Sequence, residues 1–349
     1  MKPSAWARIW WLALLLASGC GPSAASYLED GRREQAAGRA EGALEAYDLA
    51  IELDPNLASA YQGRGEVYLD LLNDPESALS NLDRAVRLDP QIAEAFSDRG
   101  FALTRLGRVR EAMTDFNRAI ELDPDLVVAY LNRATLLYTV GGDLEGALRD
   151  LNRALELDPR DARALSTRGN VYDLLGDSAS ALADYGEAIR FEPEFASAYN
   201  NRGVTYVRLG EVEKALEDFN RAIELDPEYP EAHRNRGSVY SGLGDHDAAL
   251  ADLSRSIALD DTDPRALSAR GFVYTRLRDF AAALEDFTRC LELDPRFDGA
   301  YLGRAFAHDY LGNVEAAISD YRQFLELHTD HDEAWSVAHE RLEVLVGEP

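Results

Sequence analysis

The sequence predicts an all-α solenoid made of one helix pair that repeats along the chain. Three observations carry this prediction. An acidic residue followed by proline recurs at intervals of 34 or 35 residues, with one interval of 68, at Asp54, Asp89, Asp123, Asp158, Glu192, Asp226 and Asp294. Alanine stands at position 20 of every repeat, from Ala43 to Ala317. Apolar residues between these marks follow helical spacing, so each repeat buries its apolar face against its neighbours.

The spacing divides the chain into nine units and a tail. The units are roughly 24–57, 58–92, 93–126, 127–161, 162–195, 196–229, 230–263, 264–297 and 298–331. Two of them carry one extra residue, near Asn73-Asp74-Pro75 and Gly141-Gly142-Asp143, where we expect lengthened turns. In the tail, Trp335, Ala338, Leu342 and Leu345 recur at helical spacing. They predict a capping helix over 332–346 that covers the last unit.

Within a unit, each type of residue has a fixed task, as the stretch from Ala198 to Pro227 illustrates. Small residues at positions 8, 20 and 27 let two helices approach closely, and apolar side chains at 4, 11, 24 and 28 fill the space between them. A Leu-Gly pair at 14–15 ends the first helix, because glycine accepts the left-handed conformation. Proline at 32 stops the second helix. The residue after the glycine, such as Asp177, Asp245 or Asn313, is expected to cap the second helix.

This pattern resembles the tetratricopeptide repeat. That family has an aromatic residue at position 4, Gly at 8, Tyr at 11, Ala at 20, an aromatic at 24, Ala at 27 and Pro at 32. Tyr199, Gly203, Tyr206, Ala215 and Phe219 match it in one unit. The resemblance implies a right-handed superhelix of helix-turn-helix repeats with a C-terminal capping helix. It also implies that the first helices line a concave groove in which other proteins bind.

Arginine and aspartate recur in step along the repeats. Arginine stands at position 7 in eight units, as Arg64, Arg99, Arg133, Arg168, Arg202, Arg236, Arg270 and Arg304. Aspartate stands at position 23 in seven, as Asp115, Asp150, Asp184, Asp218, Asp252, Asp286 and Asp320. We expect each arginine to pair with the aspartate of its own unit, which would fix the register of the two helices. The alternative is a row of exposed arginines that binds an anion.

The N-terminus has the features of a secretion signal. Lys2 and Arg8 precede an apolar run from Ile9 to Ala17, which is short for a membrane span. The run leads to Ala17-Ser18-Gly19-Cys20, which resembles a bacterial lipobox with alanine where leucine is usual. We therefore expect a signal peptide over 1–19, lipidation at Cys20 and a tether over 20–26, followed by the repeats over 27–331. The alternative is an ordinary signal peptide that contains Cys20.

This N-terminus also predicts a location. Acyl chains on Cys20 would hold the chain on a membrane of the bacterial envelope, facing the periplasm. Gly21 follows the cysteine, where an aspartate would favour the inner membrane, so the outer membrane is expected. The expected partners are other proteins of the envelope. The net charge of −27 excludes nucleic acid as a natural partner and favours basic or neutral proteins.

The residues expected to line the groove are those at positions 2, 5, 9, 12 and 13, carried over from the family. The candidates are Phe101, Arg105, Leu131, Tyr138, Asn170, Asn200, Arg208, Arg234, Phe272, Arg276 and Tyr310. Over units 58–331, six basic and six acidic residues occupy such positions, so the groove is far less acidic than the chain. Exposed aromatic residues there would anchor a peptide or helix. Alternatively, several of these side chains pack on neighbouring first helices.

Catalysis has little support in the sequence. Two lysines of the carboxylate clamp known in this family are replaced by Ser166 and Glu231, so that activity is not predicted. Cys290 takes the small-residue position 27 and is expected to be buried, and His328 and His331 lie at a turn without a third metal ligand. The sequence predicts no enzyme, cofactor or metal. It predicts an envelope adaptor that binds protein partners; the alternative is a lipoprotein that binds peptidoglycan or another glycan.

Overall fold

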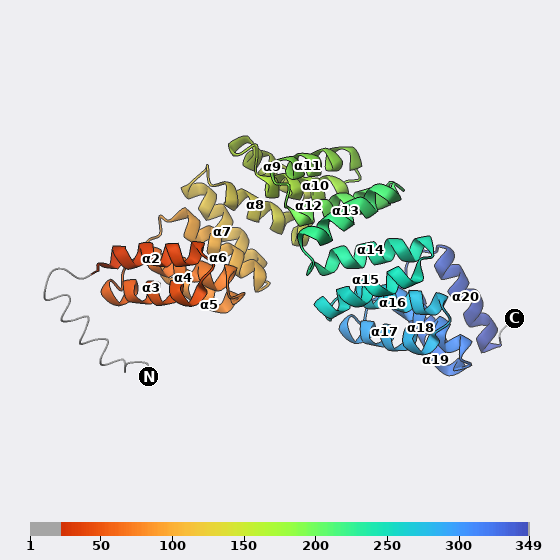
Figure 1. Ribbon diagram of the computed structural model, residues 1–349. Coiled ribbons are helices and arrows are strands. Elements are labelled where there is room, and N and C mark those ends of the chain that lie inside the picture. Colours follow the sequence, from red (N-terminus) through yellow and green to blue (C-terminus); the bar gives the residue numbers. More distant parts are fainter. Residues whose placement is uncertain (1–21, 348–349) are drawn as a thin grey trace. The chain divides into compact units, whose positions relative to one another are not determined.

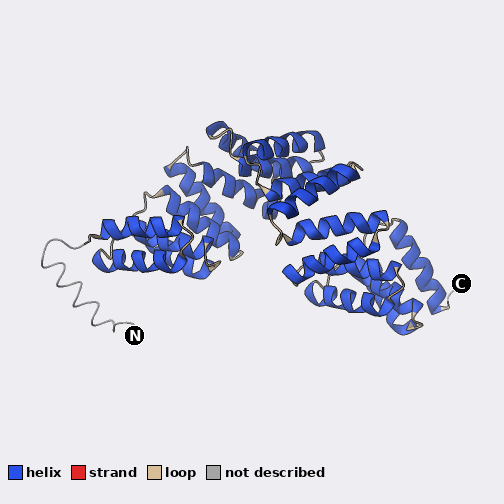
Figure 2. Cartoon of the chain, in the orientation of Figure 1, coloured by secondary structure: helices blue, strands red, loops and turns tan. Residues whose placement is uncertain are grey.

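The computed structural model describes residues 22–347, and within that range it contains nineteen α-helices, one π-helical turn and no strand (Figures 1 and 2). The first helices of the units are α2 (Ala24–Ala36), α4 (Ala58–Asp70), α6 (Ala93–Arg105), α8 (Val127–Leu136), α10 (Ala162–Leu174), α12 (Ala196–Arg208), α14 (Pro230–Leu243), α16 (Pro264–Arg276) and α18 (Asp298–Tyr310). The second helices are α3 (Ala40–Leu53), α5 (Pro75–Leu88), α7 (Val109–Leu122), α9 (Leu144–Leu157), α11 (Ser178–Phe191), α13 (Val212–Leu225), α15 (His246–Leu259), α17 (Phe280–Leu293) and α19 (Val314–Leu327). The all-α class and the repeated helix pair are confirmed.

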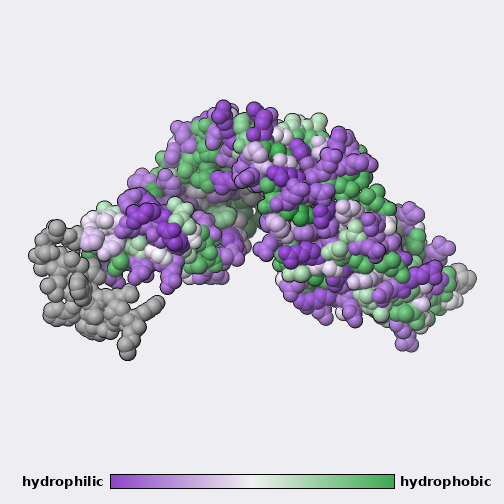
Figure 3. Space-filling model, viewed as in Figure 1, coloured by the Kyte–Doolittle hydropathy of each residue, from purple (hydrophilic) through white to green (hydrophobic). Residues whose placement is uncertain are grey.

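The chain divides into two compact parts, which we call the N-terminal part and the C-terminal part, and the division falls within α10, between Val171 and Tyr172. In each part, the first helix of a repeat packs against its own second helix and against the first helices of adjacent repeats. On the face drawn in Figure 3, hydrophilic residues cover most of the surface and hydrophobic residues form smaller patches between them. The expected signal peptide and Cys20 lie outside the described residues.

Glycine ends most first helices, as the sequence predicts. Gly107, Gly210 and Gly244 have φ between 71° and 81°, the left-handed conformation that costs other residues energy. Arg278 occupies the equivalent place in α16's turn and takes a φ of 62°. The asparagine of the first lengthened turn, Asn73, also has a positive φ, 54°.

Five of the second helices within residues 22–347 begin at an aspartate whose side chain caps the helix. Asp177 accepts a hydrogen bond from the Ser180 amide at 3.1 Å, and Asp245 accepts one from Ala248 at 3.2 Å. Asn313 does not follow this prediction. It stands at the N-cap place of α19 but makes no side-chain cap bond, because its amide nitrogen lies 3.3 Å from Nδ1 of His308.

The second extra residue is accommodated differently from the expectation of a longer turn. Leu137–Gly141 form a π-helical turn that continues α8, and Gly142 then ends it with a φ of 63°. A π turn absorbs one residue without moving the residues on either side out of register. The first extra residue, near Asn73, lies in a lengthened turn as expected.

Close approach of the two helices within a unit depends on the glycine at position 8. A Cβ added to Gly203 would lie 2.7 Å from Cε1 of Phe219, and one added to Gly100 would lie 2.7 Å from Cε1 of Phe116. Both phenylalanines are fully buried. The ring of the second helix therefore packs directly on the backbone of the first, as the small residue predicts.

In five units, a tyrosine or histidine at position 4 bonds the carbonyl of the turn before it. Tyr130 donates a hydrogen bond from its hydroxyl to the Pro124 carbonyl at 3.1 Å, and Tyr199 donates to Pro193 at 3.3 Å. His233 replaces the tyrosine in its unit. Its Nε2 lies 3.2 Å from the carbonyl oxygen of Pro227, so the imidazole takes over the same contact.

The tail forms the predicted capping helix, α20 (Glu333–Val346), which packs against α19. Asp332 caps it by accepting a hydrogen bond from the Trp335 amide at 3.0 Å. Ala338 is fully buried, and Leu342 and Leu345 pack on the same apolar cluster. No helix within residues 22–347 is long and apolar enough to cross a membrane.

Candidate partner-binding groove

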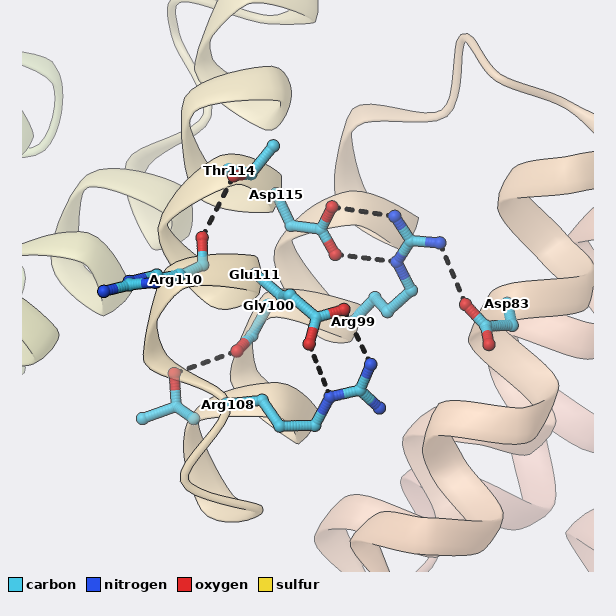
Figure 4. A network of polar contacts seen from close by, with 9 residues as sticks. Asp83, Arg99, Gly100, Arg108, Arg110, Glu111, Thr114 and Asp115 are labelled. Carbon is cyan, nitrogen blue, oxygen red and sulfur yellow. Dashed lines mark hydrogen bonds and ion pairs between the residues drawn. The ribbon is translucent and has the colours of Figure 1, made fainter.

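The recurring arginines at position 7 form ion pairs with aspartates on the second helices. Arg99 reaches Asp115 with Nε and Nη2, both at 2.7 Å (Figure 4). Arg133 meets Asp150 in the same bidentate geometry at 2.7 Å. The same pairing joins Arg202 with Asp218, Arg236 with Asp252, Arg270 with Asp286 and Arg304 with Asp320. The pairing hypothesis is confirmed, and we call this series the arginine ladder.

A third contact, which the sequence reasoning missed, extends the ladder across repeats. The free Nη1 of Arg99 donates to Asp83 on the second helix of the preceding repeat, at 2.9 Å (Figure 4). The acceptor always lies sixteen residues before the arginine. It is Asp48 for Arg64, Asp83 for Arg99, Asn117 for Arg133, Asn152 for Arg168, Asn220 for Arg236 and Ser254 for Arg270.

The ladder leaves its guanidinium groups unavailable to an anion. The Arg99 side chain is 20% exposed and Asp115 is 7% exposed. The hydrogen bond that Arg99 donates to Asp115 is the largest of the contributions that raise the pKa of Arg99, so its guanidinium group stays charged. The alternative of a row of arginines open to an anion is wrong for these positions.

An apolar pocket opens in the C-terminal part, between α12 and α14. It has a volume of about 560 Å³. Its lining comprises Val204, Val207, Arg208, Val212, Phe219, Asn235, Ser238, Val239, Gly242 and Leu243. Val204, Arg208, Ser238 and Gly242 stand at positions 9 or 13 of their repeats, so the pocket lies on the face predicted to line the groove. We call it the α12/α14 pocket.

The wall of the α12/α14 pocket is held by polar contacts behind its apolar lining. Asn235 donates to the Asn200 side-chain oxygen at 2.8 Å and so links α14 to α12. Ser238 donates from its hydroxyl to the Arg234 carbonyl at 2.9 Å. These bonds leave the methyl groups of Val204 and Val207 facing solvent, with the two residues 40% and 41% exposed.

One arginine, Arg208, lines this pocket, and the other arginines at the groove positions of α14 and α16 differ in their ion pairs. Arg208 forms an ion pair with Asp173. Arg234 and Arg265 share the single carboxylate of Asp263, with Arg265 Nε at 2.9 Å. Burial alone would raise the pKa of Asp263, but hydrogen bonds from Arg265 and Arg234 outweigh it and hold the pKa below its ordinary value.

Arg276 differs from Arg208, Arg234 and Arg265, which pair with carboxylates. Its Nη1 donates to the Ser241 carbonyl at 2.8 Å, and no carboxylate within residues 22–347 forms an ion pair with it. Ser241 precedes Gly242, which lines the pocket. A guanidinium group that forms no ion pair within residues 22–347 therefore lies against Ser241, the neighbour of the pocket-lining Gly242.

Two of the eleven predicted groove residues are not available to a partner. Leu131 is 6% exposed and Asn200 is 5% exposed. Leu131 is an apolar residue on α8, which packs against α6, so it gains by leaving water. Asn200 is buried because its side chain accepts the bond from Asn235 that joins two first helices.

The other predicted residues lie in both parts of the chain. In the N-terminal part, Phe101 is 38% exposed and Asn170 is half-buried. Tyr138 lies on the π turn, and Arg105 donates a hydrogen bond to Asn73. In the C-terminal part, Phe272 and Tyr310 are 38% and 56% exposed. Tyr310 stacks on Phe280 with ring centroids 4.8 Å apart, so one of its faces is covered.

The N-terminal part carries a cluster of carboxylates and amides, in contrast to the apolar α12/α14 pocket. Gln62 donates to Glu66 at 2.9 Å and to Asp98 at 3.1 Å, and Gln35 donates to Glu66 at 3.0 Å. Burial, followed by the charge of Glu66, raises the pKa of Asp98 well above its ordinary value. The sequence reasoning missed Asp98 because position 6 was not among the expected groove positions.

Residues that could carry chemistry are few. Cys290 is fully buried, as predicted, and burial raises the pKa of its thiol to about 12, so the reactive thiolate is disfavoured. His328 bonds Asp298, with 2.6 Å between Nδ1 and Oδ2. Within residues 22–347 no group of three histidine, cysteine or acidic side chains is arranged to hold a metal ion.

Comparison with protein-family models places the repeats directly. Models described as "TPR repeat" match residues 31–71, 136–176, 169–210 and 205–244. Models described as "Tetratricopeptide repeat" match 72–137, 230–263, 264–297 and 299–331. Together they cover most of the chain, which belongs to the tetratricopeptide repeat family. No curated protein sequence matches it.

Solved structures with the same fold come from distant proteins. The chain resembles one in the crystal structure of the APC/C hetero-tetramer Cut9–Hcn1, with a TM-score of 0.68 and 16% identity. The match covers 85% of this chain and 58% of that one. Yeast Tom70 gives a TM-score of 0.54 at 17% identity, covering 93% of this chain and 89% of that one. A tetratricopeptide repeat protein from Parabacteroides merdae ATCC 43184 gives 0.54 at 20%, covering 73% and 99%.

The fold class is thus an all-α tetratricopeptide superhelix, and the family supports a role as a protein-interaction scaffold. At these identities the structural similarity concerns the fold. What the scaffold binds has to be argued from its own side chains.

Proposed function

We propose that this protein is a lipid-anchored scaffold of the bacterial envelope that binds a partner protein in its groove. The observation that carries the proposal is the α12/α14 pocket. Val204, Val207 and Leu243 are 40%, 41% and 58% exposed there, on a chain whose charge favours a hydrated surface. Apolar side chains gathered around a concavity gain free energy when a partner covers them.

The anchoring part of the proposal rests on the N-terminal sequence. The apolar run from Ile9 to Ala17, followed by a small residue and Cys20, is typical of a lipoprotein signal. Lipid on Cys20 would confine the scaffold to a membrane surface, and confinement raises the effective concentration of an envelope partner. Labelling with a palmitate analogue tests this part: we expect label on the wild type and none on Cys20→Ala.

Site-specific crosslinking tests the groove. A photoreactive amino acid replaces Val207, which is exposed on the groove face, or Arg289, whose exposed side chain pairs with Glu292 on α17. Irradiation of intact cells followed by mass spectrometry should give a discrete adduct from position 207 and none from 289. The adduct should disappear in the pocket-filling variant Gly242→Leu.

Two results would contradict the groove as the binding face. One is an adduct from position 289 with none from 207. The other is a 207 adduct that persists unchanged in Gly242→Leu. The alternative of glycan binding stays a prediction, which sedimentation with purified cell wall tests.

A further inference from the structure

We propose that the α12/α14 pocket receives an apolar side chain from a partner segment whose flanking residues are acidic, and that Arg276 binds a flanking carboxylate. This inference rests on the proposed groove binding and specifies the chemistry of the partner. It runs against the expectation from net charge, which favours a basic or neutral partner for a chain at −27.

The shape of the pocket defines the apolar part of the partner. Its volume of about 560 Å³ exceeds that of a large side chain, and the fully buried Phe219 contributes to its lining from α13. Gly242 keeps it open. A Cβ at Gly242 would meet nothing within 4 Å, and the residue has no positive φ that would require glycine. Neither backbone conformation nor crowding requires glycine at this place in α14, so a larger side chain here would enter the pocket without displacing a neighbour.

The charges around the pocket define the acidic part. At the groove positions of units 196–297, the charged residues are Arg208, Arg234, Arg265, Arg276 and a single carboxylate, Glu231. Arg208 pairs with Asp173, while Arg234 and Arg265 share Asp263, so these three positive charges meet two carboxylates. Arg276 is the arginine of this set that forms no ion pair within residues 22–347.

Arg276 is positioned for a ligand rather than for the fold alone. Its side chain is held by the bond to the Ser241 carbonyl, so the guanidinium group is oriented while its other nitrogens keep their donor capacity. A carboxylate on the partner would supply the charge-assisted bonds that every ladder arginine already makes with aspartate. A lysine in the same place on the partner would be repelled. The pocket therefore selects acidic over basic flanking residues.

A displayed library of random peptides tests this selectivity. Peptides of about twelve residues extend over about 40 Å, enough to cross the pocket and its rim. The full chain, purified in detergent, is the bait, and Gly242→Leu is the counter-selection bait. We expect the peptides that prefer the wild type to combine a Phe, Leu, Ile or Met with Asp or Glu within three positions.

Synthetic peptides then give the magnitude. Fluorescence anisotropy with an enriched peptide should show at least about tenfold weaker binding when its apolar residue becomes alanine. Replacing its acidic residues by lysine should weaken binding about tenfold, and Arg276→Gln should remove most of that difference. Gly242→Leu should abolish measurable binding.

Two control variants test whether a loss of peptide binding comes from the pocket itself or from any glycine or arginine substitution. Gly186, on α11, is also helical, and a Cβ there would meet nothing within 4 Å, so Gly186→Leu changes a helix in the same way outside the pocket. Arg289→Gln removes an exposed arginine on α17. Both variants should bind the peptides like the wild type. Circular dichroism confirms that Gly242→Leu remains folded.

Several outcomes overturn the inference. Enriched peptides with basic flanks that are lost on Gly242→Leu would leave the groove function standing and refute the acidic partner. Equal binding of acidic and lysine-substituted peptides would refute the role of Arg276. Absence of any enrichment over Gly242→Leu refutes the pocket as a peptide site, while an adduct from Val207 in cells would still support the proposed function.

Discussion

The arginine ladder lacks its cross-repeat contact at Arg202, and restoring that contact tests how the repeats are held together. Arg202 meets Asp218 at 2.8 and 2.7 Å, but within residues 22–347 no side chain of the preceding repeat accepts from its Nη1. The acceptor place sixteen residues earlier is Gly186, which has no side chain. Asn117 fills the equivalent place for Arg133, with 2.7 Å between Oδ1 and Nη1. Gly186→Asn should complete the contact.

The expected gain follows from two contributions. Replacing a helical glycine by asparagine improves helix propensity by about 0.3 kcal/mol. A hydrogen bond to a charged group contributes about 1.5–3 kcal/mol, and the lower end applies because the Arg202 side chain is 23% exposed. Allowing for the ordering of the new side chain, Gly186→Asn should raise the free energy of unfolding by about 1–2 kcal/mol.

The comparison of Gly186→Asn with Gly186→Ala, with and without Arg202, tests whether the gain in stability comes from the ladder contact. Gly186→Ala gains about 0.5–1 kcal/mol from helix propensity alone, more than asparagine does without its partner. In the wild-type background Gly186→Asn should therefore be at least as stabilising as Gly186→Ala. In an Arg202→Met background the order should reverse. Urea unfolding followed by circular dichroism gives the four values, and hydrogen exchange of α11 and α12 localises the effect. The same order in both backgrounds would refute the ladder contact.

Two further predictions concern packing and pH. Gly203→Ala should lower the free energy of unfolding by about 1–3 kcal/mol, because the new Cβ would lie 2.7 Å from Phe219, which is fully buried; urea unfolding measures it. Hydrogen bonding to Asp298, and secondarily to Asp332, raises the pKa of His328, so protonation should favour docking of α20. This contribution is fully present below the unfolded pKa of about 6.5 and is lost as pH rises through the raised folded pKa. Intrinsic-rate-corrected hydrogen exchange of α20 should be slower at acidic pH, and His328→Asn should remove that dependence.

The fold could be predicted from the sequence because the repeat is written in residues that act locally. Gly203, Ala215 and Pro227 each impose a backbone or packing constraint within one helix pair. The pairing of Arg99 with Asp115 was predictable for the same reason: both residues belong to one unit. The contact of Arg99 with Asp83 was not, because it depends on how one repeat packs on the next.

The candidate site was less accessible to sequence reasoning. Positions carried over from the family include Arg208, which lines the α12/α14 pocket, but they also include Asn200, whose side chain is buried and accepts a bond from Asn235. The α12/α14 pocket depends on the absence of a side chain at Gly242, and a missing side chain has no signature in a hydrophobic pattern. Which groove residues remain free is decided by neighbours on other repeats.

The hydrogen bonds and ion pairs of each arginine show which guanidinium groups are already occupied within the fold. Ladder arginines such as Arg236 donate from three nitrogens to Asp252 and Asn220, so an added ligand would have to break existing bonds. Arg208 would have to leave Asp173. Arg276 could bind a carboxylate without losing an ion pair, because its recorded bond is to a backbone carbonyl. Among the arginines at the groove positions of units 196–297, Arg276 is therefore the one that a partner's carboxylate could reach without breaking an ion pair.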